Sequence, residues 1–410
     1  MNVLDKKNNS INKNRVLIYT NDLLPYSETF IKEQARALRG SWYPILVGES
    51  LILSGLALDG LDVRLLIPEH APRWRRFIYR IFRYLWLADP LVVRRLRGFD
   101  AKVIHAHFGT FAVDIWPYAR ILGLPLLVTL HGYDINIKQE WWEAGHGGLR
   151  RRTYPRRLRQ IATHSRVHFI AVSDAIRRRA IEYGIPPEKI SLSYIGINTD
   201  FFQPAGVPLY LRHKRVLFVG RMVEKKGPLL MIQAFSRVYR EVPEAELIMV
   251  GDGPMRMTAE QLACELGVPV IFTGALSSIQ VLEQLHKVRV FCLPSVTAAN
   301  GDAEGFGMVI LEAQACGVPV VSSARGGSIE GIVDGVTGFQ CNEGDIICIA
   351  DRLLRCLLDE DLAKRMSESA IKFVHENFNL IEQTKKIEKI YEQFVTSCNR
   401  TYANEVRDEI

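Results

Sequence analysis

The amino-acid sequence predicts an α/β protein built from two doubly wound, Rossmann-like domains, each containing a parallel sheet. The chain has 410 residues, which is too long for one ordinary core and suits two domains. Strand-like apolar runs alternate with helical patterns in the first half, and the same alternation begins again after residue 214. Repeated alternation of this kind is typical of parallel sheets covered by helices.

The first domain is expected over residues 15–200, after a flexible N-terminus at residues 1–14. Its first strand is the apolar run at 15–19, and a helix is predicted over 28–39. Further strands are predicted at 42–47, 63–67, 101–105, 124–130 and 167–172, and further helices at 74–87 and 175–183. The carboxyl ends of the strands should form one edge, which is where ligands bind in open α/β sheets.

The second domain is expected over residues 215–378, after a linker at 201–214 that contains proline and glycine. Strands are predicted at 215–219, 245–250, 270–273, 290–293 and 318–322, and helices at 228–240, 255–266 and 279–286. A charged pair of helices is predicted within 345–378, and a last helix at 381–395 in a terminal segment of residues 379–410. A ligand is expected in the cleft between two such domains.

The composition narrows the class of protein. No run of 18 or more uncharged apolar residues is present, so no membrane-spanning helix is predicted. The first ten residues are polar and lack the apolar segment of a secretion signal, and a cytoplasmic location is therefore expected. We interpret the seven scattered cysteines as reduced, unpaired packing residues. Residues 1–200 carry 30 Lys and Arg against 18 Asp and Glu, so the basic excess lies in the first domain.

The most informative segment reads DAEGFGMVILE and runs from residue 302 to residue 312. Gly305 and Gly307 allow the backbone to approach a ligand closely, just before a helical run. The first N–H groups of a helix are unpaired and favour a phosphate. If Gly307 begins the helix, Glu312 lies about 7.5 Å further along its axis, at ~1.5 Å per residue. Glu304 and Glu312 would then suit two separated polar parts of one ligand, such as a sugar and a ribose.

This segment and the ten residues that follow it resemble the donor site of retaining glycosyltransferases of family 4, which have the GT-B fold. The resemblance extends from about residue 15 to residue 395. It implies that Glu304 contacts the donor sugar and that Glu312 contacts the ribose. It implies that the backbone of Gly305, Phe306 and Gly307 contacts the phosphates. It also implies that the last helix crosses back onto the first domain.

Two glycine-containing turns precede this segment. In VGRMVEKKGP, Arg221 and Lys226 place two cations where a strand meets a helix, which suits a diphosphate. By the resemblance, both stabilise the leaving nucleotide diphosphate in the transition state, and solvated loop cations are the alternative. In VGDGP, Gly251 and Gly253 lie near the nucleotide by the resemblance, and an ordinary turn is the alternative.

His131 follows the predicted strand at 124–130 in the segment HGYD. The family has a His-Gly-x-Asp segment at this place, which implies that His131 lies beside the transferred sugar and the acceptor. A packed histidine is the alternative. His105 and His107 alternate as two metal ligands would, but no carboxylate or third histidine is near them in the sequence. We therefore expect a strand-end turn that lines the cleft, and no metal site.

Ser27, Glu28 and Thr29 follow the first strand and are candidates for acceptor binding. They resemble a loop that polysaccharide-building relatives present to an acceptor or to donor phosphates. Capping of the next helix by Ser27 or Thr29 is an equally good interpretation.

Residues 73–86, from Arg73 to Trp86, interleave cations with aromatic side chains. One helical face carries Phe77, Ile78, Ile81, Phe82 and Leu85, and around it lie Arg75, Arg76, Arg80 and Arg83. We predict a helix that lies on an anionic membrane surface. Packing of the apolar face against the protein's own sheet is the alternative. Nucleic acid is not an expected partner, because no nucleic-acid motif accompanies the segment.

Together these features predict a retaining hexosyltransferase, peripheral on the inner face of the cell membrane. It would move a sugar from a nucleotide-sugar to a lipid-linked saccharide in bacterial surface or exopolysaccharide biosynthesis. By the resemblance no cofactor is required, and a UDP-sugar is expected rather than a GDP-sugar. A nucleotide-sugar epimerase or a phosphorylase is an alternative. A non-catalytic assembly subunit at the membrane is another, although it would be expected to lack Glu304, Arg221 or Lys226.

Overall fold

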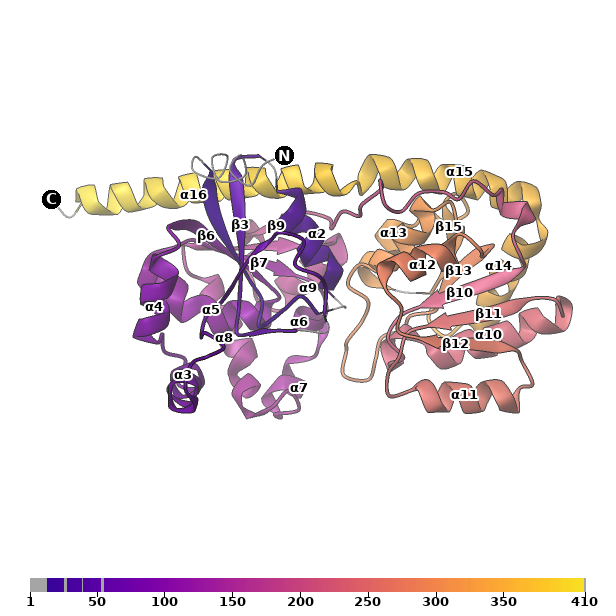
Figure 1. Ribbon diagram of the computed structural model, residues 1–410, viewed down its shortest axis with the longest axis horizontal. Coiled ribbons are helices and arrows are strands. Elements are labelled where there is room, and N and C mark those ends of the chain that lie inside the picture. The colour runs from indigo at the N-terminus through magenta and orange to yellow at the C-terminus, as the bar shows by residue number, and fades with distance from the viewer. Residues whose placement is uncertain (1–12, 26–27, 39, 53–54, 324, 409–410) are drawn as a thin grey trace. The chain divides into compact units, whose positions relative to one another are not determined.

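The computed structural model describes residues 13–25, 28–38, 40–52, 55–323 and 325–408. The chain divides into two compact units (Figure 1). Unit 1 comprises the chain up to Gly196 together with the segment from Leu380 onward, and unit 2 comprises Ile197–Asn379.

Unit 1 contains a seven-stranded parallel sheet in the order β5-β3-β1-β6-β7-β8-β9. The strands are β1 (Asn14–Tyr19), β3 (Trp42–Gly48), β5 (Asp62–Leu65), β6 (Ala101–His107), β7 (Leu126–Leu130), β8 (Val167–Ala171) and β9 (Ile190–Leu192), and a separate parallel pair is formed by β2 (Asp22–Leu23) and β4 (Ser50–Leu51). The helices are α2 (Thr29–Ala37), α3 (Arg73–Tyr84), α4 (Pro90–Arg97), α5 (Gly109–Leu122), α6 (Tyr133–Asn136), α7 (Gln139–Glu143), α8 (Tyr154–Ala162), α9 (Asp174–Glu182) and α16 (Leu380–Asp408), with short 3-10 helices η2 (Leu149–Thr153) and η3 (Pro187–Lys189). Parallel strands covered by helices need nearly continuous apolar sequence, and all five residues of β7 are buried.

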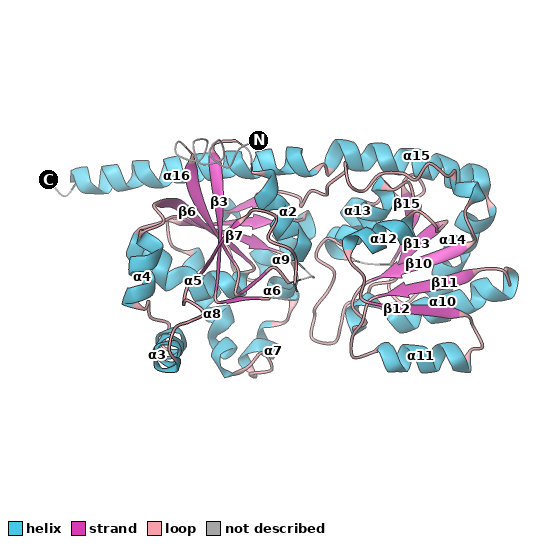
Figure 2. Cartoon of the chain, in the orientation of Figure 1, coloured by secondary structure: helices cyan, strands magenta, loops and turns pink. Residues whose placement is uncertain are grey.

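Unit 2 contains a six-stranded parallel sheet in the order β12-β11-β10-β13-β14-β15. The strands are β10 (Arg215–Val219), β11 (Glu246–Val250), β12 (Val270–Gly274), β13 (Val290–Leu293), β14 (Val320–Ser322) and β15 (Gly338–Gln340). The helices are α10 (Pro228–Glu241), α11 (Arg256–Glu265), α12 (Ser278–Leu285), α13 (Met308–Ala315), α14 (Ile346–Leu358) and α15 (Glu360–Asn377), with 3-10 helices η4 (Leu209–Leu211), η5 (Glu224–Lys226) and η6 (Gly326–Gly331). Figure 2 shows that helices surround the strands within each unit.

The last helix, α16, belongs to unit 1, as predicted. Its Ile387 and Tyr391 are buried in the hydrophobic core of that unit. The rings of Tyr391 and Trp42 meet edge to face with centroids 5.0 Å apart. The Tyr391 hydroxyl also lies 2.7 Å from Nδ1 of His105 in β6. Burial of the Tyr391 ring, together with the hydrogen bond of its hydroxyl, therefore holds α16 on the sheet of unit 1.

Two expectations are corrected at this level. The segment 201–214, expected to be a linker, belongs to unit 2 and is anchored there by the Arg212 guanidinium, which donates to the Leu285 and Val288 carbonyls, 3.1 and 3.4 Å away. Cys341 and Cys348, expected to be unpaired, form a disulfide, because β15 leads directly to the first turn of α14. Their spacing of seven residues offered no sequence signal for a bond.

Candidate functional site

The candidate donor site in unit 2 lies where the strand order reverses between β10 and β13. The loops that follow these strands are joined by hydrogen bonds. The Val296 N–H donates to the Lys225 carbonyl over 2.9 Å, and the Ala299 N–H donates to the Glu224 carboxylate over 3.3 Å. Ligands bind at such a reversal point in open α/β sheets. The fold therefore brings the predicted Arg221 and Lys226 loop next to the segment that carries Glu304.

An ion pair between Lys226 and Glu304 lies at the centre of this site. Beside it, Lys225 Nζ is 2.9 Å from Asp302 Oδ2, and all four side chains are mostly buried. Burial opposes ionisation of Glu304, but Lys226 and then Lys225 outweigh it and hold the pKa of Glu304 below its usual range. Sequence reasoning identified Lys226 and Glu304 but missed Lys225 and Asp302. The Lys-Lys doublet was the available signal.

The turn before α13 has the geometry that its glycines predict. Gly307 caps the helix at φ 73°, and a Cβ there would lie 3.1 Å from Ile310 Cδ1 and 3.3 Å from Ser328 Cβ. Glycine is therefore required by both the backbone angle and the space. The Phe306 side chain is buried, and its ring packs against Phe378 with centroids 5.4 Å apart. Phe306 thus anchors the turn in the core.

Glu312 lies in the second turn of α13. Burial raises the pKa of Glu312 to about 7. Its environment therefore differs from that of Glu304, which two lysines keep ionised. A carboxyl group that titrates near neutrality can either donate or accept a hydrogen bond, which suits a hydroxyl-rich ligand.

Gly251 and Gly253 have a structural role at this edge of the sheet. A Cβ at Gly251 would lie 2.0 Å from the Gly220 carbonyl oxygen, and one at Gly253 would lie 2.6 Å from that of Met222. The two glycines therefore let the loop after β11 pack against the loop after β10. Arg221, in the latter loop, is exposed.

In unit 1, His131 follows β7 and meets His107 at the end of β6. Nδ1 of His107 and Nε2 of His131 are 3.0 Å apart, and the two rings stack with centroids 5.2 Å apart. Burial lowers the pKa of His131 to about 3, so its ring is neutral. The Asp134 carboxylate accepts from the His131 and Gly132 N–H groups over 3.1 and 2.9 Å, and this holds the turn.

His105 differs from its expected place in a strand-end turn. It lies within β6 and is fully buried, with Nδ1 and Nε2 each 2.7 Å from the hydroxyls of Tyr391 and Thr129. It is therefore a satisfied core residue. Among the described residues, no group of three or more His, Cys, Asp and Glu side chains is arranged to hold a metal ion.

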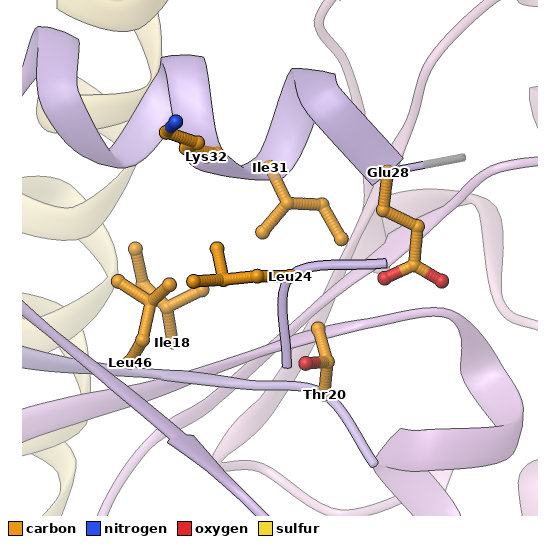
Figure 3. Close-up of a pocket in the computed structure, with 7 residues that line it drawn as sticks. All are labelled: Ile18, Thr20, Leu24, Glu28, Ile31, Lys32 and Leu46. Carbon is orange, nitrogen blue, oxygen red and sulfur yellow. The ribbon is translucent and has the colours of Figure 1, made fainter. Parts of the chain in front are cut away.

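Of the three acceptor candidates, Ser27 lies outside the described residues. Thr29 is the first residue of α2 and does not cap it, and the preceding Glu28 makes no capping hydrogen bond with its side chain. Figure 3 shows Glu28 beside a small cavity of about 10 Å³, which is otherwise lined by Ile18, Thr20, Leu24, Ile31, Lys32 and Leu46. That volume accommodates about one water molecule. Burial, and then the charge of Asp22, raises the pKa of Glu28 to about 7.

Helix α3 presents most of its apolar side chains outward, although Tyr79 is buried and Phe82 is partly buried. Trp74 and Phe77 are 63% and 62% exposed, and Ile78, Ile81, Tyr84 and Leu85 are also exposed. Arg75 is buried instead, in an ion pair with Asp89. The alternative that the apolar face packs on the protein's own sheet is therefore wrong. The expectation that all four arginines flank an exposed face is also corrected, because Arg75 and Arg83 make inward ion pairs.

Comparison with known proteins identifies the family. The model described as Glycosyltransferase Family 4 matches residues 28–201, and the model described as Glycosyl transferases group 1 matches residues 201–373. WcaL of Escherichia coli strain K12, a glycosyltransferase named for colanic acid biosynthesis, is 30% identical over 289 residues, which is 68% of each chain. The chain belongs to glycosyltransferase family 4.

Other comparisons agree with this family 4 assignment. A GDP-mannose-dependent phosphatidylinositol monomannoside mannosyltransferase of Mycolicibacterium smegmatis is 28% identical over 329 residues, which is 73% of this chain and 83% of the relative. The crystal structure of HepE from Anabaena, with UDP and glucose, matches with a TM-score of 0.73 at 20% identity, over 92% of this chain and 99% of HepE. The predicted GT-B fold is thus confirmed.

The family 4 protein is therefore a sugar-transferring enzyme, and the epimerase, phosphorylase and assembly-subunit alternatives are not favoured. In the part of the chain that the structure describes, no helix is both long enough and apolar enough to span a bilayer.

Proposed function

We propose that this glycosyltransferase transfers a hexose, with retention of configuration, from a nucleotide diphosphate sugar to a lipid-linked saccharide during assembly of a bacterial surface polysaccharide. The observation that carries this proposal is the Lys226–Glu304 ion pair beside the start of α13. It places a cation and a carboxylate beside the N-terminus of a helix, as a diphosphate sugar requires.

Each side chain has a role in this proposal. Lys226, Arg221 and the first N–H groups of α13 stabilise the charge that develops on the departing diphosphate. Glu304 accepts a hydrogen bond from a sugar hydroxyl, and Glu312 contacts the ribose. The neutral His131 contributes a hydrogen bond on the acceptor side without adding charge. The departing phosphate helps to take the proton of the acceptor hydroxyl, so no metal or other cofactor is proposed.

UDP is proposed as the donor nucleotide in preference to GDP. The fold of HepE, whose structure contains UDP and glucose, supports UDP, whereas the mycobacterial relative is named for GDP-mannose. The two nucleotides are therefore the first pair to compare.

The outward apolar face of α3 supports a membrane-bound acceptor. Trp74 and Phe77 are exposed together with Arg76 and Arg80. Apolar side chains at interfacial depth and cations near anionic headgroups are the two contributions that bind an interfacial helix to a bilayer. We therefore propose peripheral attachment to the inner face of the cell membrane through residues 73–86, and no nucleic-acid partner.

A thermal-shift series with UDP, GDP, ADP and their sugar conjugates tests the donor. A ligand present at about 100 times its dissociation constant stabilises the folded state by about 2.7 kcal/mol. A shift with UDP and UDP-sugars is expected, followed by transfer to a lipid-linked saccharide in an assay without added metal. A rise in melting temperature with guanine nucleotides alone would identify GDP, and not UDP, as the donor nucleotide. No rise with any nucleotide in folded protein would contradict the proposed function.

A further inference from the structure

Unit 1 contains a cluster of arginines that the proposed transfer chemistry does not use. The Asp114 carboxylate in α5 accepts from Arg150 over 2.7 and 3.2 Å and from Arg83 over 3.0 Å. Arg151 lies 3.5 Å from the same carboxylate, and Arg83 also pairs with Glu49, which follows β3. We call Arg83, Arg150 and Arg151 with these two carboxylates the arginine cluster.

The arginine cluster carries more positive than negative charge. Three guanidinium groups face two carboxylates, and a further cation, Arg157, lies over the Trp86 ring at 4.7 Å. Each guanidinium has five N–H donors, which exceeds what two carboxylates can accept with good geometry. Nε of Arg83 is buried and has no hydrogen-bond partner among the described residues. A partly buried positive excess with unused donors is stabilised by a bound anion.

The two carboxylates of the arginine cluster are mostly buried, because the side chains of Glu49 and Asp114 are only 16% and 8% exposed. The side chains of the three arginines remain between 16% and 25% exposed. An anion can therefore reach them from solvent without unfolding of the surrounding helices.

The arginine cluster adjoins the outward apolar surface of unit 1. Arg83 is followed in α3 by the exposed Tyr84 and Leu85, and Arg150 is preceded by Leu149, which is 74% exposed. Because Arg83 and Arg150 contact the same Asp114, these exposed apolar residues belong to one region of the surface. Figure 1 shows α3 at the margin of unit 1. A ligand with an anionic head and an apolar tail fits both features.

We propose that Arg83, Arg150 and Arg151 bind the diphosphate group that joins the saccharide acceptor to its lipid. The identity of this lipid rests on the proposed function, whereas the phosphate chemistry rests on the arginine cluster itself. Planar guanidinium groups bind phosphate oxygens through paired hydrogen bonds, and the exposed side chains of α3 cover the start of the lipid chain.

Vesicle binding tests the proposal without any nucleotide-sugar. Phosphatidylcholine vesicles that contain phosphatidic acid present a phosphate with up to two negative charges, as a diphosphate linkage does, and vesicles with phosphatidylglycerol present a singly charged diester as the control. The double variant Arg150→Gln/Arg151→Gln should bind the phosphatidic acid vesicles at least about tenfold more weakly than wild type, since charge-assisted hydrogen bonds are lost. The matched variant Arg152→Gln/Arg156→Gln removes the same charge from exposed positions of the same segment and should change binding by less than about twofold.

Two outcomes of this comparison would overturn the proposal. One is equal binding of phosphatidic acid vesicles by wild type and the folded Arg150→Gln/Arg151→Gln variant. The other is an equal loss on both kinds of vesicle, which would indicate attraction to surface charge in general. The UDP-dependent thermal shift should be unchanged in this variant, so failure of the donor proposal is recognised separately.

A second variant keeps the proposal testable if the double variant does not fold. Glu49→Gln removes an internal anion and should tighten binding to phosphatidic acid vesicles, whereas a purely structural cluster predicts no gain. Inorganic pyrophosphate then distinguishes the sources of phosphate. Competition by pyrophosphate would show that the site recognises phosphate from either source, and vesicle preference without competition would show that the lipid is needed as well. No dependence on phosphate in either measurement would refute the site.

Discussion

Glu304 and Glu312 show how the surroundings within unit 2 give one residue type two behaviours. Lys226 and Lys225 offset the cost of burying Glu304 and keep its pKa low. Burial raises the pKa of Glu312, eight residues further on, to about 7. The two carboxyl groups therefore ionise in different pH ranges.

Substitution of Lys226 by alanine should reduce the transfer rate by about 10²-fold, because the proposal assigns to this lysine the charge that stabilises the leaving diphosphate. Circular dichroism should stay unchanged. Lys214→Ala, which breaks an ion pair with Glu244 at the start of β10, is the control and should transfer normally. A normal kcat for Lys226→Ala at saturating donor would remove this lysine from the mechanism.

The pKa of Glu312 predicts how stability changes with pH. The folded-state pKa of about 7 exceeds the ordinary value of 4.5, so the neutral form is favoured in the folded protein. The contribution of Glu312 to the free energy of unfolding is fully present below pH 4.5 and is lost as the pH rises through 7. Glu312→Gln should therefore melt at the same temperature as wild type near pH 4.5 and a few degrees higher at pH 8. The same difference in melting temperature between Glu312→Gln and wild type at both pH values would contradict the raised pKa of Glu312.

Elements of secondary structure place these groups and also decide which faces are exposed. The Gly307 turn starts α13 beside the lysine loop, whereas inward ion pairs of Arg75 and Arg83 turn the apolar face of α3 toward solvent. A buried guanidinium with its partner is costly to separate. The orientation of α3 is thus determined by its arginines as much as by its apolar residues.

Gly307→Ala should destabilise the protein by more than Gly335→Ala does. Both glycines have φ 73°, so each alanine incurs the left-handed penalty of about 1–2 kcal/mol. Only the Cβ at position 307 would contact neighbours, while position 335 has nothing within 4 Å. Chemical denaturation and donor titration measure both effects, and weaker donor binding is expected for Gly307→Ala alone. Equal donor affinity of the two variants would show that the Gly307 turn does not contribute to donor binding.

Removal of the exposed aromatic side chains of α3 should weaken vesicle binding without loss of stability. Trp74→Ser/Phe77→Ser leaves the core intact, and sedimentation with anionic vesicles should fall at least about tenfold through lost apolar burial. Met257→Ser/Ile279→Ser, at exposed apolar positions of unit 2, is the control and should sediment like wild type. Unchanged sedimentation of the α3 variant would exclude this helix as the membrane contact.

The whole molecule consists of two units, and unit 1 is built from two chain segments that are separated in sequence by unit 2. Unit 1 is completed by α16, which begins only after unit 2 has ended at Asn379. Tyr391 links the end of the chain to Trp42 and His105 in the core of unit 1. Folding of unit 1 therefore depends on contacts such as that between Tyr391 and His105, which are 286 residues apart in the sequence.

Tyr391→Ala should destabilise unit 1 by about 3–5 kcal/mol, as expected when a large buried aromatic side chain is deleted. Hydrogen exchange should accelerate in peptides from β1 and β6, while peptides from β10 and β13 keep their protection. Tyr391→Phe, which loses only the hydroxyl contact with His105, should cost much less. Equal acceleration in both units would show that α16 does not stabilise unit 1 selectively.

Much of the order of strands and helices could be predicted because local periodicity and turn residues are properties of short segments, although α4, α5 and α8 were not predicted. The start of α13 at Gly307 and its neighbouring glutamates were found for the same reason. Lys226 and Glu304 were assigned to one site through a family pattern, and the fold brings them together. The chemical class of the enzyme was thus determined by the sequence.

The tertiary structure alone decided which partner each buried group acquired. The Lys225–Asp302 pair, the Cys341–Cys348 bond and the inward turn of Arg83 depend on where separate elements meet. Helical periodicity identified the apolar face of α3 but not the side on which it lies. Periodicity describes a face relative to its own helix axis, whereas burial and charge pairing depend on neighbours that only the folded chain supplies.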